Sequence, residues 1–142
     1  MKRWVLAVML SAGMVLGGAM LLWGADGSSK LQQEEKAATA RAAQDYLKYG
    51  LAQAGEGRDA EAAKAFRQAI AIRPDWAEAH SLLGSSLARL GDSREAEAEL
   101  RKAVTLKPDY AEGWYYLGIF LKGEHKDKEA EEALAKARQY SR

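Results

Sequence analysis

The sequence repeats itself at a spacing of 34 residues, and this periodicity restricts the possible fold more than any other feature. Pro74 and Pro108 stand 34 positions apart, in the matching segments Ile-Arg-Pro-Asp-Trp-Ala-Glu and Leu-Lys-Pro-Asp-Tyr-Ala-Glu. Small residues recur at the same interval in two columns: Gly50, Gly84 and Gly118 in one, and Ala62, Ala96 and Ala130 in the other. A fixed period of about 20 to 50 residues is typical of repeat architectures, in which each unit packs mainly against its neighbours.

Each repeat is expected to be a pair of antiparallel helices. Two helices approach closely only where the side chains between them are small, and the glycine and alanine columns provide such a contact. A proline ends the second helix, because it lacks an N–H donor and forces the preceding residue out of helical geometry. The pattern therefore predicts an all-α fold, with helices at about 43–54, 59–72, 77–90, 93–106, 111–123 and 127–140.

Polar residues suggest where three of these helices begin. An aspartate with a glutamate three residues later is the capping-box pattern, and it occurs as Asp75 with Glu78, Asp92 with Glu95, and Asp109 with Glu112. Trp76 and Tyr110 open two of the predicted helices. They are interpreted either as staples over the preceding turn or as contacts for a partner.

The period and its glycine, alanine and proline columns resemble the tetratricopeptide repeat (TPR), a 34-residue helix–turn–helix unit, over residues 43–142. The resemblance implies an α-solenoid of three repeats at residues 43–76, 77–110 and 111–142. Stacking is required in such a fold because a single repeat cannot bury its apolar face.

In the TPR family, columns 2, 5, 9 and 12 of each repeat face a concave groove. The groove residues implied here are Gln44, Leu47, Leu51 and Ala54; Glu78, Ser81, Ser85 and Ala88; and Glu112, Tyr115, Ile119 and Lys122. Family members that clamp a peptide's C-terminal carboxylate use Lys and Asn where this chain has Leu47 and Leu51. The resemblance thus favours an apolar or weakly basic protein segment, helical or extended. Periodicity leaves open whether Leu47, Leu51 and Ile119 serve the groove or the core.

The N-terminal segment has a different composition. Residues 4–23 carry no charge and follow the basic Lys2 and Arg3. A helix of this length is about 30 Å long, the thickness of the hydrocarbon layer of a membrane. We expect a transmembrane anchor within residues 1–23 and a linker with a helical extension over residues 24–42. Gly13 and Gly17 form the GxxxG pattern that pairs membrane helices.

This segment also predicts a location. Basic residues before the apolar stretch keep the N-terminus cytoplasmic by the positive-inside rule, which places the repeats outside the cytoplasm. The expectation is a single-pass protein of the bacterial inner membrane with a periplasmic TPR domain. A signal peptide cleaved near Gly17 and Ala19 is the alternative.

Composition argues against chemistry. The chain has no cysteine, which excludes thiolate metal sites and a cysteine nucleophile, and its 21 basic and 20 acidic residues lack the basic excess typical of nucleic-acid binding. His80 is expected to pack between helices, in the column of Tyr46 and Trp114, and His125 to lie in a turn. The glutamates within 95–99 and 129–132 are interpreted as solvated helix faces. No catalytic residue, cofactor or metal is therefore expected.

These observations favour a protein that binds other proteins over an enzyme. The leading hypothesis is a membrane-tethered scaffold that recruits or organises partners of an envelope complex through the TPR groove. Two alternatives stay open. One is a small accessory or structural subunit of a membrane complex, held by its transmembrane helix. The other is a secreted periplasmic TPR adaptor formed by signal cleavage.

Overall fold

The computed structural model describes the backbone of residues 2–142 and the side chains of residues 27–142. Within that part the chain is all-α and forms six helices. These are α1 (Lys2–Gly55), α2 (Asp59–Ile72), α3 (Ala77–Leu90), α4 (Ser93–Leu106), α5 (Ala111–Gly123) and α6 (Asp127–Tyr140). The bounds of α2 to α6 confirm those that the repeat pattern predicts.

The chain divides into two compact units, Met1–Thr39 and Ala40–Arg142. In the first unit, the described residues 27–39 are helical and fully solvent-exposed. Thr39 Oγ1 donates a hydrogen bond to the carbonyl oxygen of Glu35, 2.7 Å away, within the same helix. The residues predicted as a linker, 24–29, are part of α1.

The prediction of a transmembrane helix over residues 4–23 is corrected. Among the described residues, no helix combines the length and the apolar character that crossing a membrane requires. From Gly27 onward α1 is exposed and carries Lys30, Glu34 and Lys36, charges that hydrocarbon would not tolerate. The single-pass inner-membrane location, with the N-terminus cytoplasmic and the repeats periplasmic, depended on that helix and is corrected with it. The predicted Gly13/Gly17 pairing and the cleavage site lie outside the residues whose side chains are described.

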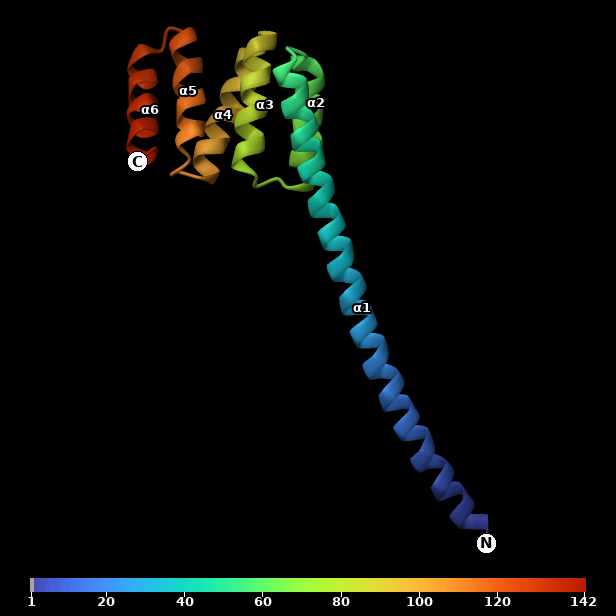
Figure 1. Ribbon diagram of the computed structural model, residues 1–142. Helices are drawn as coiled ribbons and strands as arrows, with labels where there is room; N and C mark the ends of the chain where they lie inside the picture. The colour runs from blue at the N-terminus through green and yellow to red at the C-terminus, as the bar shows by residue number, and fades with distance from the viewer. Residues whose placement is uncertain (1) are drawn as a thin grey trace. The chain divides into compact units, whose positions relative to one another are not determined.

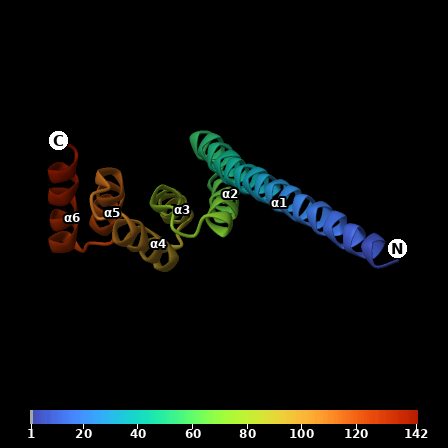
Figure 2. The ribbon, with the colours of Figure 1, turned by 90° about the horizontal axis from the view of Figure 1, so that it is seen from below.

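The second unit is a stack of helical hairpins. Helices α3 and α4 lie side by side and antiparallel, as do α5 and α6, and successive pairs follow in chain order (Figures 1 and 2). One core runs through the stack, with members from the end of α1 and from every later helix. Its largest apolar members are Leu47, Phe66, Trp76, Leu83, Leu87, Leu100, Leu117, Phe120 and Leu121.

The glycine column provides the close contact that the sequence predicts. A Cβ atom on Gly84 would lie 2.6 Å from Leu100 Cγ and 3.0 Å from the carbonyl oxygen of Ala96. Its equivalents Gly50 and Gly118 would meet Phe66 and Leu134 in the same way. The facing alanines are buried. The two helices of each hairpin can therefore touch only because these positions lack larger side chains.

The predicted capping boxes are wrong. The N-cap residues of α3 and α5 are Trp76 and Tyr110, one position after the aspartates, and neither makes a side-chain cap bond. Asp92 does occupy the N-cap of α4, also without such a bond. The proline turn uses the extended backbone of the aromatic residue to enter the helix. Glu78 and Glu112 in the first turns still favour the positive end of the helix dipole.

Trp76 and Tyr110 contact the turns that precede them, as the staple interpretation expects. The Arg73 guanidinium carbon lies 4.1 Å from the centroid of the Trp76 ring. Lys107 Nζ lies 5.5 Å from the centroid of the Tyr110 ring. A cation over an aromatic face is attracted by the negative charge of the ring, so each pair fastens a proline turn to the next front helix.

Ion pairs join each back helix to the next, which corrects the interpretation of the glutamates as merely solvated. Arg67 of α2 pairs with Glu95 of α4 at 2.8 Å, and Arg101 of α4 pairs with Glu129 of α6 at 2.5 Å. These two pairs stand 34 residues apart and are equivalent rungs of one ladder. Glu97 contacts Lys126 Nζ at 2.7 Å.

Candidate functional site

Two adjoining hollows lie along the front helices, which are residues 43–55 of α1 together with α3 and α5. A hollow of about 430 Å³ lies between α3 and α5. A second, of about 270 Å³, lies between α1 and α3. They share Ser85, Arg89 and Tyr116 in their linings. We call the two together the groove.

The groove presents apolar side chains to solvent. Leu51 is 42% exposed, Ile119 is 49% exposed and Tyr115 is 52% exposed. The half-buried Ala54 and Ala88 form part of its floor. Exposed apolar side chains around a hollow are characteristic of a surface that buries part of a partner.

Two of the predicted groove residues are buried instead. Leu47 is 3% exposed and belongs to the core. Ser81 is fully buried and donates a hydrogen bond to the carbonyl oxygen of Glu78 at 2.9 Å. Column 5 therefore faces inward in the first two repeats and outward only at Tyr115. The open question for Leu47 is decided by the bulk of the neighbouring repeat, which periodicity within one helix does not reveal.

Charged and polar residues stand at the two rims of the groove. Glu78 and Glu112 are exposed in the first turns of α3 and α5, and Gln44 is exposed at the equivalent position of α1. Lys122 is exposed near the end of α5. One rim is thus weakly acidic, and the opposite rim carries a lysine.

Arg89, Tyr116 and Phe120 line the groove but are absent from the predicted set. Arg89 is fixed in place: Nη2 lies 2.6 Å from Asp59 Oδ1, and Nη1 donates a hydrogen bond to Ser85 Oγ at 3.0 Å. Its charge is therefore largely compensated by Asp59 of α2. The signal that was available is its position directly after Ala88, a predicted groove column.

His80 packs between helices, as predicted. It is 1% exposed, and Nε2 donates a hydrogen bond to the carbonyl oxygen of Pro74 at 2.8 Å, while Nδ1 faces the Glu99 carboxylate. Trp114, one repeat later, donates from Nε1 to the carbonyl oxygen of Pro108 at 2.8 Å. The column thus ties each front helix to the preceding proline turn. Across residues 27–142, no three His, Asp or Glu side chains are grouped in a way that could hold a metal ion.

The stacked hairpins and the groove define a helical-repeat protein of the α-solenoid class. A family model described as a TPR repeat matches residues 50–91, and one described as a tetratricopeptide repeat matches residues 77–110. The chain is a tetratricopeptide-repeat protein. No curated protein matches the sequence.

Solved structures share the fold. A crystal structure of MamA is 24% identical with a TM-score of 0.64, over 72% of this chain and 60% of that one. The chain thus spans about three fifths of the length of MamA. The second TPR of Spaghetti (RPAP3), bound to the HSP90 peptide SRMEEVD, is 18% identical with a TM-score of 0.69, over 75% of this chain and 98% of that one. The TPR2B domain of yeast Sti1, in a pHsp70 complex, is 23% identical with a TM-score of 0.67, over 70% and 80%. At these identities the likeness concerns the fold.

Proposed function

We propose that this chain is a protein-interaction scaffold whose groove binds an apolar or weakly basic segment of a partner protein, either helical or extended. The observation that carries the proposal is the set of exposed apolar side chains, Leu51, Tyr115 and Ile119, around two adjoining hollows. A monomeric surface seldom exposes such a set without a partner for it. Two similar structures hold chaperone-derived segments, which supports a protein ligand.

The charges of the groove favour a partner that differs from an acidic peptide such as SRMEEVD. The central cation, Arg89, is already paired with Asp59. Glu78 and Glu112 would repel an acidic segment lying across the first turns of α3 and α5. A segment with large apolar side chains and a Lys or Arg directed toward that rim would satisfy both features.

A peptide-display selection against the full chain tests this chemistry. We expect the enriched sequences to carry apolar residues with one or more basic residues, and SRMEEVD to bind at least about tenfold more weakly than they do. Selection of acidic, apolar-poor sequences would contradict the proposal.

Single substitutions then test the location. Leu51→Glu and Ile119→Glu each place a charge in the groove without disturbing the core, because both side chains are largely exposed. We expect each to weaken the selected peptides about tenfold or more. Leu106→Glu is the matched control, since Leu106 is 39% exposed and lies on the back helix α4. Equal binding by all three variants would remove the groove as the site.

A further inference from the structure

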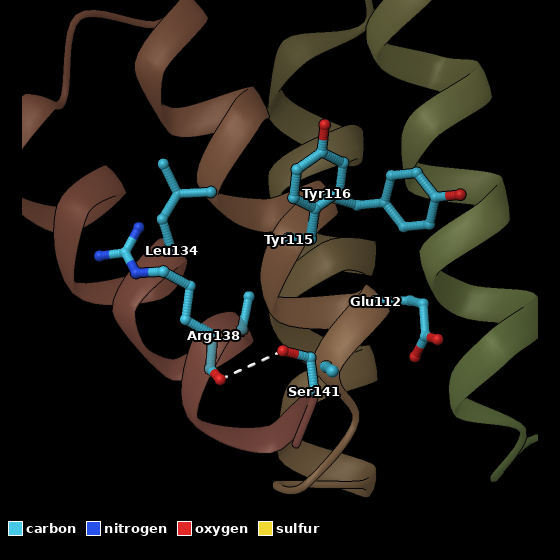
Figure 3. Close-up of a pocket in the computed structure, with 8 residues that line it drawn as sticks. Glu112, Tyr115, Tyr116, Leu134, Arg138 and Ser141 are labelled. Carbon is cyan, nitrogen blue, oxygen red and sulfur yellow. Dashed lines mark hydrogen bonds between the residues drawn. The ribbon is translucent and has the colours of Figure 1, made fainter.

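The two ends of the repeat stack present faces that are buried at every internal joint between repeats. The first, here called the N-face, is a hollow lined by Ala42, Asp45, Tyr46 and Tyr49 of α1. The second, the C-face, is a hollow of about 360 Å³ on α5 and α6, lined among others by Tyr115, Leu134 and Arg138 (Figure 3).

The N-face consists of the residues by which a front helix packs on the preceding repeat. Tyr46 is 41% exposed, whereas its equivalent His80 is 1% exposed. Tyr49 is 54% exposed, whereas Leu83 and Leu117 in the same column are each 2% exposed. Among residues 27–142, nothing covers the two tyrosines in the way that α2 and α4 cover the later columns.

The C-face consists of the residues on which a following repeat would pack. Counting back 34 residues, Leu134 corresponds to Leu100 and Ala137 to Ala103, both fully buried. Tyr115 corresponds to Ser81, whose Oγ lies 3.5 Å from the hydroxyl oxygen of Tyr110 in the next repeat. The structure thus shows what fills this place internally: the beginning of another front helix.

The two faces complement each other in size and in charge. Internally the small Ser81 meets the large Tyr110. At the ends the sizes are exchanged, with Tyr115 on the C-face and Ala42 at the Tyr110 position of the N-face.

The charge change is paired as well. Arg138 stands in the column of Ile70 and Val104, while Asp45 stands in the column of Ala79 and Gly113. Val104, Ala79 and Gly113 are buried at the internal joints and Ile70 is partly buried, whereas Arg138 and Asp45 are exposed. An apolar pair of columns has become a basic column at one end and an acidic one at the other.

We propose that the C-face of one copy of this chain docks on the N-face of a second copy, head to tail, so that the stack of repeats continues across the junction. The occupant of each face is the opposite face of an identical chain. Such an interface is heterologous, because it joins two different surfaces, and it therefore builds open rows rather than a closed pair. The groove plays no part in this argument.

Site-directed cross-linking distinguishes this arrangement from symmetric pairing. The chain has no cysteine of its own, so Ala42→Cys marks the N-face and Ser141→Cys marks the C-face without interference. With a short bis-maleimide, we expect an equimolar mixture of the two full-length variants to form a covalent dimer. Each variant alone should stay at the level of the cysteine-free chain. Cross-linking of either variant with itself, or no cross-link in the mixture, would overturn the proposal.

Charge reversal tests the paired columns. Asp45→Arg alone, or Arg138→Asp alone, should weaken self-association by about tenfold, measured by sedimentation velocity over a range of concentrations. The double variant should recover most of that loss. Lys128→Asp, the same change of charge at another exposed position of α6, is the matched control and should leave association unchanged. Failure of the double variant to recover would refute the pairing.

A gain of affinity gives an independent test. The ladder Arg67–Glu95 and Arg101–Glu129 continues to Ala135 on the C-face side and begins from Glu61 on the N-face side. Ala135→Arg would supply the missing rung between copies and should tighten self-association by about two- to fivefold. Gln139→Arg, which adds the same charge outside the ladder, should not. Equal effects of the two substitutions would count against a continued stack.

Discussion

At the scale of single residues, the fold depends on three glycines that admit a neighbouring helix. Gly84→Ala places a methyl group 2.6 Å from Leu100 Cγ and 3.0 Å from a backbone oxygen that cannot move aside. Overpacking of this kind costs about 1 to 3 kcal/mol, against a helix-propensity gain of about 0.5 to 1 kcal/mol. We expect a net loss of about 1 to 2 kcal/mol in the free energy of unfolding, measured with denaturant.

Gly123→Ala is the matched control for that substitution. Nothing lies within 4 Å of a Cβ atom at Gly123, the last residue of α5. The same chemical change should there leave stability unchanged or raise it slightly. If the two variants lose stability equally, helix contact does not explain the glycine column.

A second prediction at this scale concerns acid. The hydrogen bond from Lys126, with a further one from Arg101, lowers the pKa of Glu97 below its ordinary value. A carboxyl group with a lowered folded-state pKa stabilises the fold above its unfolded-state pKa, and that contribution disappears as the pH falls through the folded-state value. Because both cations are partly exposed, the contribution should be below about 1 kcal/mol at pH 7.

Glu97→Gln tests this dependence. The stability difference from wild type should be constant above the ordinary glutamate pKa, about 4.3, and shrink as the pH falls below it. The measurement is urea unfolding between about pH 7 and about pH 3. Glu131→Gln, at an exposed position of α6, should show no such difference. A difference that grew on acidification would reverse the sign of the argument.

Residue-level prediction from sequence succeeded where the cause is local to a repeat and failed where it lies in the next one. The glycine and alanine columns record contacts within a hairpin, so their recurrence revealed them. Leu47 and Ser81 belong to a predicted groove column, but they are covered by the bulk of the adjacent repeat, which no pattern within one helix encodes. Arg89 was missed because its partner, Asp59, lies 30 positions away.

At the scale of elements, the turns inside the hairpins share one backbone requirement. Gly57, Gly91 and His125 occupy the same column, with φ angles of 75°, 86° and 58°. A residue with a side chain is strained in this left-handed region by about 1 to 2 kcal/mol, and glycine is not. His125→Gly should therefore stabilise the chain by about 0.5 to 1 kcal/mol, read as a rise in melting temperature.

The reverse substitution is the control. Gly91→His puts the same strain into the turn between α3 and α4, and it should destabilise by a similar amount. Opposite signs for the two variants support a shared left-handed turn. Destabilisation by His125→Gly would instead mean that the imidazole contributes contacts that outweigh the strain.

The starts of the elements show why sequence signals alone were insufficient. The capping-box pattern at Asp75 and Asp109 is a reliable indicator only when the helix begins at the aspartate. Here the proline turn takes one more residue, and the backbone of Trp76 or Tyr110 enters the helix. The helix bounds were predictable because proline and the repeat period fix them, whereas the capping atoms were not.

At the scale of the whole molecule, stability should reside in one of the two compact units. Every buried residue among those described lies between Ala43 and Ala137, whereas residues 27–41 are exposed throughout. A helix without packed side chains adds little to folding stability, since isolated helices are marginal in water. Deleting residues 1–39 should therefore leave the melting temperature within about 2 °C of the full chain.

Deleting an equivalent length from the other end should have the opposite effect. Removal of residues 111–142 uncovers Ala103 and Val104 and takes away α5 and α6, which supply part of the single core. In a stack stabilised by contacts between neighbours, losing one of three repeats removes both its own stability and a joint. We expect the melting temperature of this truncation to fall by more than about 10 °C, measured by circular dichroism at 222 nm. Comparable losses from the two deletions would show that residues 1–39 support the repeats, and that the core is not confined to the second unit.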